Sequence, residues 1–192
     1  MRRPLRTMAL VSLLVFAAST QATARTRRVR SAVNQIQVPP TQQDFLEWLH
    51  GVDQTEIHLG QLAQVNSSDP AVRRYGKMLV RDHTAIDVKI QAFAKAKGWT
   101  LGPFLPTTAL GQKMRTADRA VGSELHAMTG PMFDHTFLAA MVTGHDAAIA
   151  TIIAGMRQFP DTDALLRPAV RALHKHRVRA WRLLGRMKLQ NV

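Results

Sequence analysis

The chain of 192 residues contains no cysteine. This absence excludes a disulfide framework, a thiol nucleophile and any zinc or iron–sulfur site held by cysteine. A metal ion would therefore have to be bound by histidine and carboxylate side chains. Acidic residues are also scarce: 13 of them stand against 26 Lys and Arg, which gives a formal net charge of +13. An excess of this size favours polyanionic partners.

Aromatic residues make up only 6% of the chain, whereas 46% of the residues are hydrophobic. The dominance of Leu, Ala, Val and Met favours helices that pack on helices. The sequence has no G-x-S-x-G, P-loop or G-x-G-x-x-G motif and no recognisable nucleophilic triad. We therefore assign no catalytic residues, and a role other than catalysis is favoured.

Residues 1–24 have the features of a signal peptide. A basic start, MRRPLRT, precedes a short apolar run, MALVSLLVFAA, and Ala22-Thr23-Ala24 is an A-x-A cleavage site. The run is too short for a transmembrane helix, and an uncleaved anchor is the alternative. We expect cleavage after Ala24, and a periplasmic or secreted protein with a formal charge of about +10 once the three arginines of this segment are lost.

The rest of the chain divides into a short arm and one domain. Residues 25–40 contain RTRRVR and end in two prolines, which predicts a flexible basic arm. Residues 41–188 carry helical seams of apolar residues. No later segment is judged long and apolar enough to cross a membrane, so the processed protein is expected to be soluble; its oligomeric state is left open.

Four long helices are predicted from these seams and from their end signals. Thr41 begins the first helix, and Asp69-Pro70 begins the second, which closes at Gly98. A long connection over 99–130 contains a shorter helix. Pro131 opens the third helix, and Asp161 or Thr162 caps the fourth, where Pro168 predicts a kink or a delayed start. This order of hairpin, long crossover and hairpin predicts an all-α, ferritin-like four-helix bundle.

Each of the four seams is interrupted by a polar residue near its middle. Counting from the two turns places these interruptions at similar heights, so they should converge inside the bundle. Buried His and carboxylate side chains suit iron, manganese, zinc or copper. The candidate metal ligands combine the interruptions with adjacent carboxylates: Glu56, Asp82, His83, His145, Asp146 and His176.

An alternative interpretation needs no cofactor. The same side chains could form a hydrogen-bonded polar core without metal. A di-iron centre of the ferritin type is disfavoured because the chain has no Glu-x-x-His motif. Adjacent residues such as Asp82 and His83 lie about 100° apart on a helix and do not share a face.

Four segments occur together and in order: TEIHLGQLA, VRRYGKMLVRDHT, FDHTFLAAMVTGHDAAI and ALHKHR. With them, the chain from Gln43 to Met187 resembles the domain of unknown function 4142 family, exported bacterial proteins with a ferritin-like bundle. The resemblance implies that the family's helix-one Glu falls on Glu56 and that its Asp-His pair falls on Asp82 and His83. Its later histidines fall on His145 and His176.

The third helix departs from the family's pattern. Gly144 stands where the family usually has Asp before the histidine, and Asp146 stands where Glu often follows it. If that Asp ligates, the resemblance implies a site poorer in carboxylate here. The family has no settled activity, so the resemblance implies fold and export rather than function.

The fourth helix is strongly basic. Its outward cations predict a face that binds polyanions, and for an exported protein the accessible partners are anionic lipid and lipopolysaccharide. Nucleic acid would bind such a face through its phosphates, but export disfavours it as the natural partner. A solvated face with no partner is the alternative. The residues of the predicted polyanion face are Arg171, Lys175, Arg179, Arg182 and Arg186.

Overall fold

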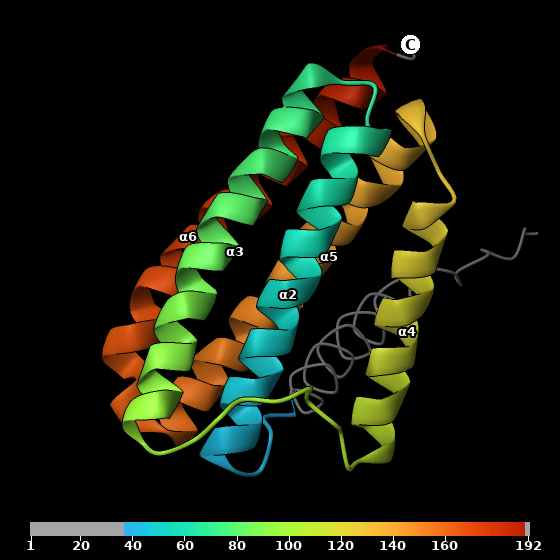
Figure 1. The fold of residues 1–192 in the computed structure, drawn as a ribbon. Helices are drawn as coiled ribbons and strands as arrows, with labels where there is room; N and C mark the ends of the chain where they lie inside the picture. Colours follow the sequence, from blue (N-terminus) through green and yellow to red (C-terminus); the bar gives the residue numbers. More distant parts are fainter. Residues whose placement is uncertain (1–36, 191–192) are drawn as a thin grey trace, which may run out of the picture. The chain divides into compact units, whose positions relative to one another are not determined.

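The computed structural model describes residues 37–190. The predicted signal peptide and residues 25–36 of the predicted arm lie outside the described residues. Within the described part every regular element is a helix (Figure 1). The helices are α2 (Gln42–Asn66), α3 (Pro70–Ala96), α4 (Ala109–His126), α5 (Gly130–Gln158) and α6 (Asp163–Gln190), with a single 3-10 turn, η1 (Pro160–Thr162), before α6.

The predicted starts of the first two long helices are confirmed by their caps. The Thr41 hydroxyl accepts a hydrogen bond from the Asp44 backbone N–H at 3.1 Å, and the Asp69 carboxylate accepts one from the Ala71 N–H at 2.6 Å. Pro70 occupies the start of α3, where no N–H is needed. Gly98, just past the end of α3, has φ of 79°, a conformation that favours glycine.

Two hairpins result from the short turns between α2 and α3 and between α5 and α6. The first hairpin has a very close crossing at Gly60 and Gly76. A Cβ atom on Gly60 would lie 2.7 Å from the Gly76 carbonyl oxygen, and one on Gly76 would lie 2.6 Å from the Gly60 carbonyl oxygen. In the second hairpin α6 begins at Asp163 and continues through Pro168, so the proline does not delay the helix.

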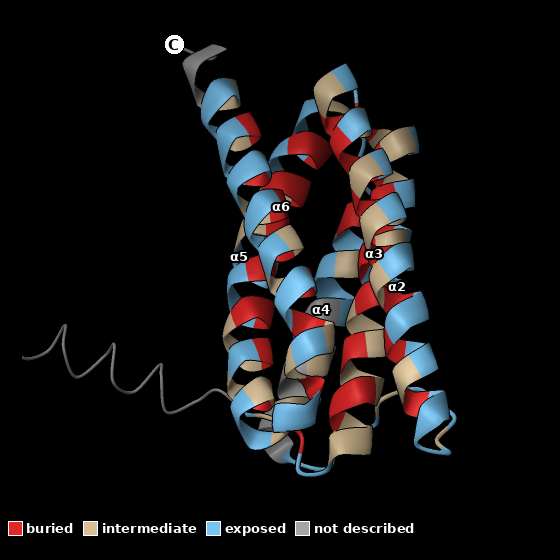
Figure 2. Ribbon diagram, turned by 90° about the vertical axis from the view of Figure 1, so that its left-hand side faces the viewer, coloured by how far each residue is buried: buried red, intermediate tan, exposed pale blue. Residues whose placement is uncertain are grey.

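The apolar core is divided into two clusters by a polar layer. One cluster surrounds Tyr75, Phe133 and Phe137, and the other surrounds Phe45 and Ile90. Helices α2, α3, α5 and α6 contribute to both clusters, and their buried faces turn toward one another (Figure 2). On each of these helices at least one buried polar residue lies between the two apolar sets, which places the polar layer near mid-height. The buried Asp134 of α5 lies outside this layer, beside Phe133.

The crossover helix α4 runs beside the hairpins (Figure 1). Its Leu125 is buried in the core cluster around Tyr75. The Asn66 side-chain amide at the end of α2 donates to the Met128 carbonyl at 2.8 Å just after α4. These contacts fix the C-terminal end of α4 against the first hairpin.

By length and composition alone, α5 could cross a membrane. This differs from the sequence-based expectation that no segment after the predicted signal peptide is long and apolar enough to do so. A core helix passes the same test, and α5 carries two buried polar side chains, Asp134 and His145. Asp134 accepts hydrogen bonds from the Ser68 hydroxyl at 3.0 Å and the Asp69 N–H at 3.3 Å, so it ties α5 to the α2–α3 turn.

Candidate metal centre

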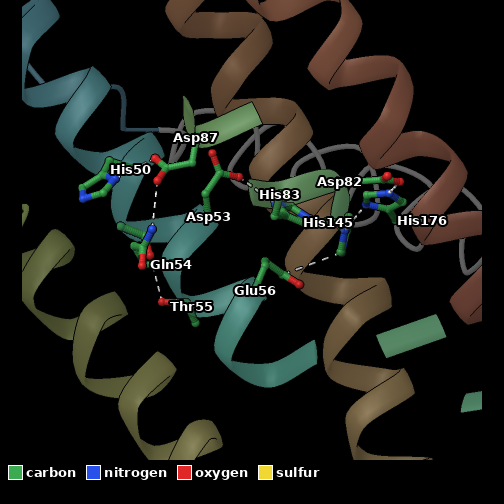
Figure 3. Close-up of polar contacts among 11 residues, drawn as sticks. His50, Asp53, Gln54, Thr55, Glu56, Asp82, His83, Asp87, His145 and His176 are labelled. Carbon is green, nitrogen blue, oxygen red and sulfur yellow. Dashed lines mark hydrogen bonds and ion pairs between the residues drawn. The ribbon is translucent and has the colours of Figure 1, made fainter. Parts of the chain in front are cut away.

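Three histidines meet in the polar layer. His83 of α3, His145 of α5 and His176 of α6 are each only 1% exposed. One ring nitrogen from each lies within 4.8 Å of the other two (Figure 3). Three imidazoles from three helices therefore surround one point in the protein interior.

The outward nitrogen of each ring is held by an acceptor. His83 Nδ1 lies 2.7 Å from Asp53 Oδ1, and His145 Nδ1 lies 2.8 Å from the Met141 carbonyl oxygen. His176 Nε2 lies 2.9 Å from Asp82 Oδ2. Outer acceptors of this kind fix the orientation of metal-ligating histidines and direct their second nitrogen toward the ion.

The inward nitrogens lack such partners. His145 Nε2 and His176 Nδ1 face one another at 3.4 Å. When each neutral ring keeps its proton on the anchored nitrogen, two lone pairs meet with no hydrogen between them. Two nitrogens bound tetrahedrally to zinc at about 2.0–2.1 Å would lie about 3.3 Å apart. The spacing of these two atoms therefore matches a shared cation.

Burial favours the neutral form of His83 and His176, the form that binds metal. Burial lowers the pKa of His83, and burial lowers the pKa of His176 to about 4. Burial, with the nearby Asp87 carboxylate, raises the pKa of Asp53 to about 8. At neutral pH the Asp53 carboxyl group and the neutral His83 ring thus carry one proton each. Only one of these two protons can lie in the hydrogen bond between Asp53 Oδ1 and His83 Nδ1.

Glu56, also predicted as a ligand, is a buried carboxylate beside the three grouped histidine donors rather than one of them. Its Oε1 lies 3.9 Å from His145 Nδ1, outside hydrogen-bond distance. Its Oε2 is buried without a hydrogen-bond partner, as are Asp53 Oδ2 and His83 Nε2. Buried polar groups without partners are costly, so the centre is incomplete as a purely hydrogen-bonded network.

The two aspartates predicted as ligands have other positions. Asp82 is half-buried and accepts from the outer nitrogen of His176, so it supports a ring rather than entering the centre. Burial opposes its ionisation, but hydrogen bonds from Arg81 and His176 outweigh burial and lower its pKa. The prediction that Asp146 belongs to the centre is not supported by its position: it is exposed and pairs with Arg177. It lies about 100° around α5 from His145 and so faces away.

Sequence reasoning missed a second buried carboxylate network beside the centre. Asp87 accepts from His50 Nδ1 at 2.6 Å and from the amides of Gln54 and Gln91 at 2.8 and 2.7 Å. Helical spacing could have indicated that Asp87 is buried, because it lies four residues after His83 and three before the buried Ile90 on the same helix. Asp53 also follows the buried Leu49 by four residues.

The remaining predicted residues lie at the surface. His58 and His126 pair through their Nε2 atoms at 2.7 Å while staying exposed. All five members of the predicted polyanion face are exposed on α6: Arg171, Lys175, Arg179, Arg182 and Arg186.

Fold and site together define an all-helical protein with a buried three-histidine centre. Comparison with protein families matches residues 27–183 to a domain of unknown function, DUF4142. The chain belongs to this family, as its ordered segments predicted. Comparisons with curated proteins and with solved structures give no significant match.

Proposed function

We propose that this chain is an exported, ferritin-like four-helix-bundle protein that binds one transition-metal ion through His83, His145 and His176. The supporting observation is the arrangement of the three rings. Each ring is anchored on its outer nitrogen, and the inner nitrogens lie within 4.8 Å of one another.

The donor set favours some metals over others. Imidazole suits zinc, copper and iron, whereas manganese prefers oxygen ligands. Glu56 is the buried carboxylate available to offset the charge of the ion. With three histidines and one such carboxylate, the centre fits a single ion better than a carboxylate-rich di-iron pair. A bound ion would supply Lewis-acid or redox chemistry according to its identity.

The competing explanation is a polar core that shares a proton. A proton between His145 Nε2 and His176 Nδ1 would make one imidazolium, which Asp82 could stabilise through His176. Burial acts against this because it favours the neutral rings. The two explanations differ in one measurable respect, since only the metal site responds to added metal.

The decisive experiment is metal titration of the chelator-treated protein without a His tag. At about 100 times Kd a ligand that binds only the native state adds about 2.7 kcal/mol, or about 5–10 °C in Tm for a domain of this size. The test metals are zinc, copper, iron and manganese. We expect one ion per chain and loss of the Tm increase in His83→Ala and His176→Ala.

Two controls make the result specific. His174→Ala changes an exposed histidine two residues from His176 and should leave the increase intact. Repeating the titration in His58→Ala removes binding at the exposed His58–His126 pair. A Tm that does not respond to any of the four metals, or that responds equally in His176→Ala and His174→Ala, would overturn the proposal.

A further inference from the structure

The outward face of α6 carries an unusual row of positive charge. Its five exposed cations lie within an arc of about 80° and extend over about 22 Å of helix, at 100° and 1.5 Å per residue. The row consists of Arg171, Lys175, Arg179, Arg182 and Arg186. We call it the basic row.

The basic row is not neutralised by neighbouring acids. Among the described residues, the ion pairs of α6 join Arg167 to Asp163, Arg177 to Asp146 and His176 to Asp82, and none includes a member of the row. Like charges held side by side without partners repel one another, so this face gains from an anionic surface laid along it.

Two apolar side chains project beside the row. Trp181 is 65% exposed and Val178 is 37% exposed. Around the helix axis Val178 lies about 20° and Trp181 about 80° from Arg171, on the side away from Arg179. Trp is enriched at the boundary between lipid headgroups and acyl chains, and Arg stems can extend along apolar surface while their heads reach phosphates.

A shallow recess continues this face between α5 and α6. Its volume is about 380 Å³, and it shares Arg171 with the basic row. Ile153, Met156 and Val170 supply apolar lining, and Arg157 adds a guanidinium group. Arg167 also lines the recess, where it pairs with Asp163. A recess with apolar and arginine walls fits the junction between a phosphate headgroup and its acyl chains.

We propose that the outward face of α6 docks on the surface of an anionic phospholipid bilayer. The basic row faces the phosphates, and Trp181 and Val178 enter the interfacial layer. This docking does not involve the metal centre, because His176 lies on the buried side of α6, about 100° around the helix from the middle of the basic row. Failure of one proposal would therefore leave the other standing.

The test is binding of the processed chain, residues 25–192, to vesicles of phosphatidylglycerol and phosphatidylcholine at low and high salt. Each basic residue near such a surface contributes about fivefold in affinity. Reversal of Arg171, Lys175, Arg179 and Arg182 to Glu should weaken binding by at least several hundred-fold. A matched control reverses four exposed cations of α3 and should weaken it far less: Arg74, Lys77, Lys89 and Lys95.

Trp181 provides the second readout. On binding, its emission should shift to the blue and be quenched by brominated lipid, measured as the difference between wild type and Trp181→Phe. Met132→Ala removes an exposed apolar side chain on α5 and should bind as wild type.

Three results would overturn the proposal: no binding at low salt, equal loss in the α6 and α3 variants, or a Trp181 that stays accessible to aqueous quencher on the vesicle. Binding to duplex DNA without binding to vesicles would also overturn it in favour of a nucleic-acid surface.

Discussion

His145 Nε2 and His176 Nδ1 lie 3.4 Å apart, and each ring has its other nitrogen against a separate acceptor. This pair links α5 to α6 at the height where Asp53 and His83 link α2 to α3. The outer acceptors therefore fix the orientation of the rings, and changing an acceptor should change how well the rings bind a metal ion.

Asp82→Asn should weaken metal binding without unfolding the protein. The carboxylate accepts from His176 Nε2, and an amide placed there holds the ring less strongly. Loss of such an outer partner typically lowers metal affinity about 10–100-fold. Competition with a chromogenic chelator measures the change. Asp146→Asn, an exposed control, should bind as wild type; equal losses in the two variants would contradict the assignment.

Glu56→Leu should have opposite effects on the metal-free and metal-bound protein. Without metal it removes a buried carboxylate with an unpartnered oxygen, so stability should be unchanged or rise by about 1–2 kcal/mol. With metal it removes the charge that offsets the ion, so affinity should fall. Urea unfolding with EDTA and with metal measures both effects. Parallel destabilisation in both conditions would show that Glu56 serves only to fill space.

Metal-free stability should pass through a maximum near pH 6.5. The native pKa of His176 is about 4 and that of His83 is lowered, against 6.5 when exposed, so stability gained from neutral rings rises between pH 4 and 6.5. The pKa of Asp53 is about 8 in the native protein and 3.8 when the side chain is exposed. Its contribution to the free energy of unfolding therefore decreases from pH 4 to pH 8. Up to about pH 6.5 the increasing contributions of His176 and His83 to the free energy of unfolding outweigh the decreasing contribution of Asp53. Above that pH only the decrease from Asp53 remains.

Urea unfolding with EDTA from pH 4.5 to 8.5 measures this profile. Each titrating group contributes a slope of up to about 1.4 kcal/mol per pH unit. Asp53→Asn should remove the fall above pH 6.5 and leave the rise below it. A wild-type profile that is flat or rising from pH 6.5 to 8 would show that Asp53 ionises normally in the native protein.

Gly60→Ala should destabilise the protein, whereas Gly51→Ala on the same helix should not. The new Cβ at Gly60 would lie 2.7 Å from the Gly76 carbonyl oxygen, which forces α2 and α3 apart at a cost of about 1–3 kcal/mol. No atom lies within 4 Å of a Cβ at Gly51, so alanine there should stabilise the helix by about 0.5–1 kcal/mol. Thermal unfolding compares the two, and similar shifts in both would contradict the close crossing.

Export predicts a processed chain that begins at Arg25. Intact mass and N-terminal sequencing of protein from the periplasmic fraction should show loss of residues 1–24, since Ala22 and Ala24 are the small residues a signal peptidase requires. Replacing Ala24 with a bulky residue should cause the precursor to accumulate. Full-length protein confined to the cytoplasm would contradict the prediction.

Local signals predicted the helix boundaries well because they act over a few residues. Thr41 and Asp69 cap the helices whose starts they marked, and the long connection contains a helix as expected. The phase of each buried face was harder to predict. Val52 and Ile86 are apolar and occur at helical spacing, yet the adjacent Asp53 and Asp87 are the buried residues.

That error has a physical cause. Apolar periodicity assumes that buried positions are apolar, so a carboxylate inside a seam is assigned to solvent. One oxygen of Asp53 pairs with His83 and one oxygen of Asp87 pairs with His50, and those partners become visible only when the helices are packed. The three histidines were found because each interrupted an otherwise apolar run, whereas the outward direction of Asp146 depended on the rotation of α5.

The polar layer joins the two helical hairpins of the chain. Each hairpin is built from neighbouring helices, while His83 comes from the first hairpin and His145 and His176 come from the second. The hydrogen bond from His176 to Asp82 also spans the two hairpins. Contacts made only when the hairpins dock form late in folding and break early in unfolding, so strengthening this layer should lengthen the lifetime of the native state more than it speeds folding.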